Sequence, residues 1–279
     1  MTAIAPASLD DVVAELAAHP GTQLLAGGTD FMVEVNHGAR RPPRVVSLRR
    51  VDELRAWHRD GDVVVIGAGV TYTELQQTEL ATLVPCLAQA ARTVGSPQIR
   101  NAGTLGGNLA TASPAGDTLP PLAALDALVE IAGPDGRRVA ALDELIVGPK
   151  RTSLGAGEVI ASVHVPIVRG AQEYLKVGTR NAMVISVAGV AVVIDIDGRS
   201  VRCALGSVGP VPIRAAEAEE QIARSIDWST LTAPSEAATE FGRLAAAAAS
   251  PIDDHRSTAE YRRHAVGVCA RRALERCLP

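Results

Sequence analysis

The chain of 279 residues has few aromatic residues, no closely spaced cysteine pair and no long apolar run. Phe, Trp and Tyr supply only 3% of it, so a hydrophobic core must be built mainly from Ala, Val, Leu and Ile. No apolar stretch approaches the roughly 20 residues that a membrane-spanning helix needs. The N-terminus, MTAIAPASLDD, has neither a basic region nor an apolar export segment. We therefore expect a cytoplasmic protein without a membrane span.

Metal-binding, hydrolytic and nucleic-acid-binding patterns are also missing. The four cysteines, at 86, 203, 269 and 277, lack C-x-x-C spacing, which predicts reduced, partly buried thiols. The six histidines show no ligand spacing, and we find no Ser-His-Asp or paired-carboxylate arrangement that supports hydrolysis. A net charge of −4 gives no electrostatic case for nucleic acid. If the protein takes part in a metal redox chain, the clusters belong to another polypeptide.

The sequence does contain two glycine-rich segments, LLAGGTDF at 24–31 and IRNAGTLGGNLATASPAGD at 99–117. Adjacent glycines let backbone N–H groups approach a ligand closely. Such loops suit a pyrophosphate, especially where they open onto a helix N-terminus. Two of them predict a dinucleotide held between two strand-to-helix junctions. VVVIGAG at 63–69 has only part of the usual dinucleotide fingerprint, because Tyr72 stands where its third glycine belongs.

Three blocks near these glycines, together with one near the C-terminus, resemble a known family. AGGTD at 26–30, TLGGN at 104–108, TASPAGD at 111–117 and DDHRSTAEYRR at 253–263 are similar to the FAD-binding medium subunit of molybdenum hydroxylases. That family includes xanthine dehydrogenase and carbon monoxide dehydrogenase, and the resemblance covers essentially the whole chain. The AGGTD form is closer to the xanthine and N-heterocycle branch than to the carbon monoxide branch.

The resemblance implies an oxidoreductase subunit that holds FAD non-covalently. It would pass electrons from iron–sulfur clusters on a small subunit through FAD to NAD or another acceptor. A large subunit would carry the molybdenum cofactor and oxidise the substrate. Three alternatives stay open: a carbon monoxide dehydrogenase medium subunit, a self-contained FAD-dependent oxidoreductase of the same fold superfamily, and a scaffold that has kept the fold. Neither a catalytic residue nor a metal ligand is expected on this chain.

Sixteen residues are expected to bind the cofactor. They are Leu24, Leu25, Ala26, Gly27, Gly28, Thr29, Asp30, Phe31, Thr104, Leu105, Gly106, Gly107, Asn108, Asp117, Ile160 and Lys176.

Several of these residues have an alternative, purely structural interpretation. Thr29 and Asp30 are suited to cap a helix that starts at Phe31, and Asp117 is suited to cap the helix expected over 118–127. Ile160 fits an ordinary core position. Lys176 fits the solvent face of a strand, whereas the resemblance places it near the flavin. The resemblance also puts Val94 near the adenine end, and residues 256–263 are expected to form a structural polar seam on the last helix.

The order of elements predicts an α+β protein in two domains. Residues 1–166 would form a two-part FAD-binding domain of the PCMH type, and residues 167–279 a smaller domain of β-sheet and helices. We expect helices over 8–21, 71–78, 79–95 and 118–127, with Pro85 interrupting or starting the third. We expect no helical period in the second glycine segment. Asp197-Gly198 predicts a hairpin turn within 195–200.

Overall fold

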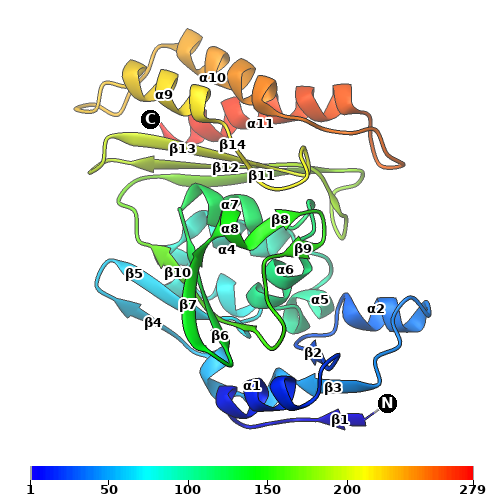
Figure 1. Cartoon of the computed structure of the whole chain (residues 1–279). Coiled ribbons are helices and arrows are strands. Elements are labelled where there is room, and N and C mark those ends of the chain that lie inside the picture. The colour runs from blue at the N-terminus through cyan, green and yellow to red at the C-terminus, as the bar shows by residue number, and fades with distance from the viewer. Residues whose placement is uncertain (1, 279) are drawn as a thin grey trace.

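A computed structural model describes residues 2–278 of the chain. It confirms the predicted mixture of sheets and helices, arranged in layers (Figure 1). No helix within the described residues is both long enough and apolar enough to cross a membrane.

The N-terminal layer is a small parallel sheet with two helices. Strands β1 (Thr2–Ile4), β2 (Gln23–Leu25) and β3 (Arg44–Ser47) pair in the order β1-β3-β2. Helix α1 (Leu9–Ala18) joins β1 to β2, and the Ser8 side chain caps it by accepting a hydrogen bond from the Asp11 N–H. After β2 the first glycine loop leads directly into helix α2 (Phe31–Asn36), as the sequence predicts.

The central layer is an antiparallel sheet in the order β4-β5-β10-β6-β7. Its strands are β4 (Trp57–Asp60), β5 (Val63–Gly67), β6 (Leu128–Gly133), β7 (Gly136–Ala141) and β10 (Val159–Pro166). The accompanying helices are α3 (Thr78–Leu83), α4 (Pro85–Thr93), α5 (Pro97–Ala102), α6 (Leu105–Thr111), α7 (Leu119–Ala124) and α8 (Leu142–Leu145). Short elements complete it: η1 (Leu48–Arg50), η2 (Asp52–Arg55), η3 (Glu74–Gln76), β8 (Ile146–Gly148) and β9 (Arg151–Thr152).

Two expectations for this layer need correction. The second glycine segment contains two short helices, α5 and α6, although no helical period was expected there. Capping starts both of them: Ser96 accepts from the Ile99 N–H, and Thr104 accepts from the Gly107 N–H. The helix expected over 71–78 is reduced to a turn and η3. Pro85 starts α4, since proline fits the first turn of a helix.

The C-terminal layer is an antiparallel sheet covered by three helices. Strands β11 (Gln172–Gly178), β12 (Ser186–Asp195), β13 (Ser200–Gly206) and β14 (Ile213–Arg214) pair in sequence order. Asp195 and Ser200 close the hairpin, and the Asp195 carboxylate accepts a hydrogen bond from the Gly198 N–H. Helices α9 (Ala216–Ser225), α10 (Ser235–Ala248) and α11 (Ala259–Cys277) lie on one face of this sheet, and α4 and α7 lie on the other (Figure 1).

The burial of this sheet on both faces explains the apolar sequence of β12. All but the last residue of Ser186–Asp195 is buried. Ala191 and Val193 join the hydrophobic core of the central layer, whereas Val190 and Val192 join the core beneath α10 and α11. Successive side chains of a strand point to opposite faces, so β12 connects two cores.

Candidate cofactor-binding site

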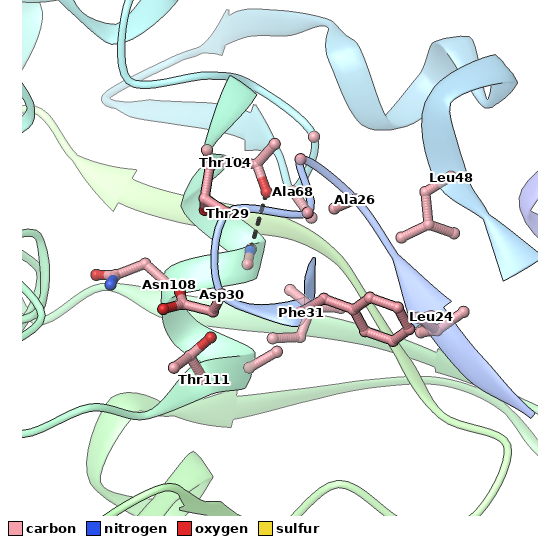
Figure 2. Close-up of a pocket in the computed structure, with 18 of the residues that line it drawn as sticks. Leu24, Ala26, Thr29, Asp30, Phe31, Leu48, Ala68, Thr104, Asn108 and Thr111 are labelled. Atoms are coloured by element: carbon pink, nitrogen blue, oxygen red, sulfur yellow. Dashed lines mark hydrogen bonds between the residues drawn. The ribbon is translucent and has the colours of Figure 1, made fainter. Parts of the chain in front are cut away.

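The two glycine segments meet at a cavity of about 260 Å³. Twelve of the sixteen predicted residues line it: Leu24, Ala26, Gly27, Gly28, Thr29, Asp30, Phe31, Thr104, Gly106, Gly107, Asn108 and Ile160. In Figure 2 the loop that carries Thr29 and Asp30 lies beside α6, which carries Asn108 and Thr111. The chain thus brings together loops that are some 75 residues apart in sequence.

Close contact between the loops requires glycine at position 27. A Cβ on Gly27 would lie 1.7 Å from the Ala102 carbonyl oxygen and 3.0 Å from the Gly103 nitrogen. Gly28 adopts a φ of +75°, in the left-handed region that favours glycine. The first glycine pair therefore lets the loop turn sharply and pack directly on the backbone that precedes α6.

The two segments differ in the backbone donors that they offer. Within residues 2–278, none of the N–H groups of residues 27–31 donates to a protein acceptor. In contrast, the N–H groups of Leu105 and Gly106 donate to the carbonyls of Val70 and Ala68, at 2.9 and 2.8 Å. The Gly107 N–H donates to Thr104 Oγ1 at 3.0 Å, the dashed line in Figure 2. The first loop thus has a row of N–H groups without protein acceptors, whereas α6 lines the cavity with its first N–H groups already bonded within the protein.

Neither predicted cap on the two aspartates is formed. Asp30 occupies the N-cap position of α2, but its side chain makes no capping hydrogen bond. It lines the cavity instead. Asp117 precedes the N-cap Thr118 of α7 and makes no cap either. The Thr118 hydroxyl instead donates to the Asn108 side-chain oxygen at 2.6 Å, which fixes the amide of a cavity residue.

Four predicted residues do not line the cavity: Leu25, Leu105, Asp117 and Lys176. Leu105 is fully buried in the core, so its side chain points away from the cavity. Lys176 is not on the solvent face either, because only 6% of its side chain is exposed. Val94, expected near the adenine end, packs against the core at the end of α4 and accepts a hydrogen bond from Arg100 at 3.0 Å.

Asp117 and Lys176 form a buried cluster with Tyr174. Lys176 Nζ lies 2.6 Å from Asp117 Oδ2 and also donates to the Thr93 carbonyl at 3.1 Å. The Tyr174 hydroxyl donates to Asp117 Oδ1 at 3.0 Å. Burial raises the pKa of Asp117, although Lys176 and the Tyr174 hydroxyl partly oppose that shift. The pKa of Tyr174 is raised by burial and by the neighbouring carboxylate.

The rest of the lining was not predicted to bind the cofactor, although Gly103, Ala110 and Thr111 lie within the second glycine segment. It comprises Glu34, Arg40, Leu48, Ala68, Gly69, Tyr72, Gly103, Ala110, Thr111, Lys150, Leu154 and Val159. Ala68 and Gly69 belong to the GAG turn after β5, so the partial fingerprint at 63–69 contributes to the cavity after all. Tyr72 is 5% exposed, and burial, with Asp117 and Asp30 nearby, raises the pKa of its phenol.

The C-terminal block DDHRSTAEYRR lies outside the cavity lining and is held by internal contacts. Arg262 is 4% exposed and donates to the carbonyls of Val187 and Ser207, at 2.9 and 2.8 Å. It also pairs with Asp254 Oδ1 at 2.7 Å, and Arg256 pairs with the other oxygen of that carboxylate at 3.4 Å. Arg262 therefore fastens α11 to strand β12 and to the end of β13.

Two family models match the chain. One sequence-family model, described as the FAD binding domain in molybdopterin dehydrogenase, matches residues 1–168. A second, the CO dehydrogenase flavoprotein C-terminal domain, matches residues 173–277. The chain belongs to the flavoprotein subunits of the molybdopterin dehydrogenase family. This confirms the family that the sequence blocks suggested.

Known members of this flavoprotein family match the chain over nearly its whole length. The xanthine dehydrogenase FAD-binding subunit of Escherichia coli O157:H7 is 30% identical over 278 residues, which are 96% of this chain and 92% of that protein. The nicotine 6-hydroxylase medium subunit of Paenarthrobacter nicotinovorans is 35% identical over 275 residues, covering 96% and 94%. A reconstituted CO dehydrogenase from Oligotropha carboxidovorans superposes with a TM-score of 0.91 at 30% identity, covering 99% and 97%.

The cavity fits the FAD that a flavoprotein of this family binds. The unused N–H groups of residues 27–31 need acceptors, and the diphosphate of FAD supplies oxygens for them. Gly27 and Gly28 have no side chains, so the backbone of this loop is open to close approach by a ligand. At about 260 Å³ the cavity is small next to the 300–1,000 Å³ usual for small-molecule sites, so it would enclose part of a dinucleotide.

Proposed function

We propose that this chain is the FAD-binding electron-transfer subunit of a heteromeric molybdenum hydroxylase. Electrons would enter from iron–sulfur clusters on a small subunit and leave to NAD or another acceptor. A large subunit would hold the molybdenum cofactor. The bound flavin supplies the redox chemistry, while this protein supplies binding, orientation and electrostatics. We place the complex in the cytoplasm and, from AGGTD at 26–30, on the xanthine and N-heterocycle branch.

The row of unused donors at residues 27–31 carries this proposal. Successive backbone N–H groups form an anion-binding concavity, which suits the diphosphate of a dinucleotide. We propose that the sixteen predicted residues form its binding region, in which the twelve lining residues contact FAD and Leu25 and Leu105 support the two loops. Residues 1–166 would be the FAD-binding domain and residues 167–279 the C-terminal domain. The lining residues hold the diphosphate and the adjoining groups, with Ile160 packing against the flavin end.

For Asp117 and Lys176 the proposal requires a local rearrangement. The Asp117–Lys176 pair is buried and does not line the cavity. Thr118, the next residue after Asp117, donates a hydrogen bond to the cavity residue Asn108, so a short path connects the pair to the cavity. We propose that FAD binding exposes Lys176 to the flavin, where an ammonium favours an anionic reduced ring. The reduction potential of FAD bound to the variant Lys176→Met should then be lower than in the wild type. An unchanged potential would remove Lys176 from the binding region.

Native purification tests the proposed function. We expect a yellow complex of three polypeptides that contains flavin, iron and molybdenum. Acid precipitation should release intact FAD into the supernatant, because the site is proposed to be non-covalent. A freshly purified complex without flavin, or with flavin left on the precipitate, would contradict the proposal. Native purification of the flavin-containing chain without any partner subunit, with substrate oxidation of its own, would instead favour a self-contained oxidoreductase.

A further inference from the structure

Two cationic side chains lie at the cavity, and neither belongs to a glycine motif. Arg40 follows α2, and its guanidinium carbon lies 5.0 Å from the centre of the Phe31 ring. Lys150 lies between β8 and β9, where its backbone N–H donates to the Ala112 carbonyl at 2.8 Å. Its φ of +54° places the residue in the left-handed region. Both residues line the cavity, although the chain separates them by 110 positions.

Glu34 lies between the two cations. Its Oε2 is 2.8 Å from Arg40 Nε, and its Oε1 is 3.5 Å from Lys150 Nζ. Neither contact is aligned as a hydrogen bond. Within residues 2–278 neither cationic side chain donates a hydrogen bond to a protein acceptor. The carboxylate therefore keeps both charges near the cavity. Apart from the Arg40 Nε–H, which faces Glu34, the N–H donors of the two side chains have no hydrogen-bond acceptor among residues 2–278.

These donors lie beside the unused backbone row. Phe31 contributes the last N–H of that row, and its ring carries the Arg40 guanidinium. Glu34, which holds Lys150, is three residues further along the same helix, so it lies close to Phe31. A guanidinium and an ammonium next to several free N–H groups match a phosphate, whose oxygens accept hydrogen bonds from both kinds of donor.

We infer that Arg40 and Lys150 form a subsite for the phosphate groups of the flavin nucleotide, with Glu34 positioning both. The inference rests on the proposed function, because it assigns side-chain partners to the FAD that the cavity is proposed to hold. It adds to that function an electrostatic component, so FAD affinity should fall as salt concentration rises.

Flavin titrations of the full-length chain, freed of flavin, test the subsite. The dissociation constants of FAD and of riboflavin, which has no phosphate, are measured from flavin fluorescence at low and high salt. Arg40→Gln should weaken FAD about tenfold, since it removes charge-assisted hydrogen bonds. Lys150→Gln should weaken FAD about threefold, because this side chain is 66% exposed and screened. Riboflavin binding should not change, and the double variant should lose most of the salt dependence.

Two neighbouring residues provide matched controls. Arg41 and Arg151 are exposed and do not line the cavity, so Arg41→Gln and Arg151→Gln should leave FAD affinity unchanged. Wild-type affinity for FAD in the Arg40→Gln and Lys150→Gln variants would overturn the subsite alone. Equal losses of FAD and riboflavin would also overturn it, because they would indicate a structural defect. A wild-type chain that binds neither flavin would overturn the proposed function as well.

Discussion

Lys176 Nζ lies 2.6 Å from Asp117 Oδ2, with 6% and 7% of the two side chains exposed. The pair links β11 to the segment before α7, and Tyr174 and Thr93 complete its hydrogen bonds. A buried ion pair is stable only while both partners are present, because removing one leaves the other as an uncompensated buried charge. The pair therefore connects the C-terminal sheet to the central layer.

Lys176→Met should destabilise the protein by about 3–5 kcal/mol, the usual cost of breaking a buried ion pair on one side. Urea denaturation of the wild type and the variant measures this loss. Adding Asp117→Asn should restore much of the stability, since the second substitution removes the unpaired carboxylate. If the single variant is as stable as the wild type, the two groups are not a buried pair in solution.

The Asp254 carboxylate gives the protein a pH-dependent contact. Hydrogen bonds from the Arg256 N–H and the Arg262 guanidinium lower its pKa to about 2. A carboxyl group whose pKa is depressed by folding stabilises the native state above its unfolded pKa, near 3.9. That stabilisation should be lost as the pH falls from about 4 to about 2.

Asp254→Asn tests this contact. The asparagine keeps the shape but loses the charge, so stability at pH 7 should fall by about 1–3 kcal/mol, as for a hydrogen bond to a charged group. The difference between the variant and the wild type should shrink below pH 4. Thermal unfolding midpoints from pH 2 to 7 measure it, and a constant difference over that range would contradict the assignment.

The sequence predicted the two glycine loops as ligand loops, and the first one leads into a helix as expected. It did not predict α5 and α6, because Gly103, Gly106 and Gly107 weaken the helical signal that capping by Ser96 and Thr104 restores. The Asp117–Lys176 pair joins positions 59 residues apart, and no local pattern encodes such a contact. Arg40 and Lys150 were missed for the same reason, since only the folded chain brings them to one cavity.

Gly27→Ala should disrupt the cavity more than the same change elsewhere. The new Cβ would overlap the Ala102 carbonyl, and backbone must move to relieve that contact. We expect FAD affinity to fall by about tenfold or more, because the loops separate. Gly148→Ala is the control, since a Cβ at position 148 meets no atom within 4 Å. Flavin titration and melting temperatures of both variants check the prediction, and equal behaviour would contradict it.

The last prediction concerns turnover by the chain alone. The four cysteines are buried and lack the spacing of a cluster-binding motif. Within residues 2–278 no group of three or more His, Cys, Asp or Glu side chains is placed to hold a metal ion. Under the proposed function the cavity holds FAD, and the electrons that reduce this FAD come from another polypeptide. We therefore expect the isolated, FAD-loaded chain to show at most weak NADH–dye activity. It should not oxidise purines, heteroaromatic compounds, aldehydes or carbon monoxide, whereas the natively purified complex should oxidise its substrate and reduce this FAD. Rapid substrate oxidation by the isolated chain would refute the electron-transfer role and favour the self-contained oxidoreductase.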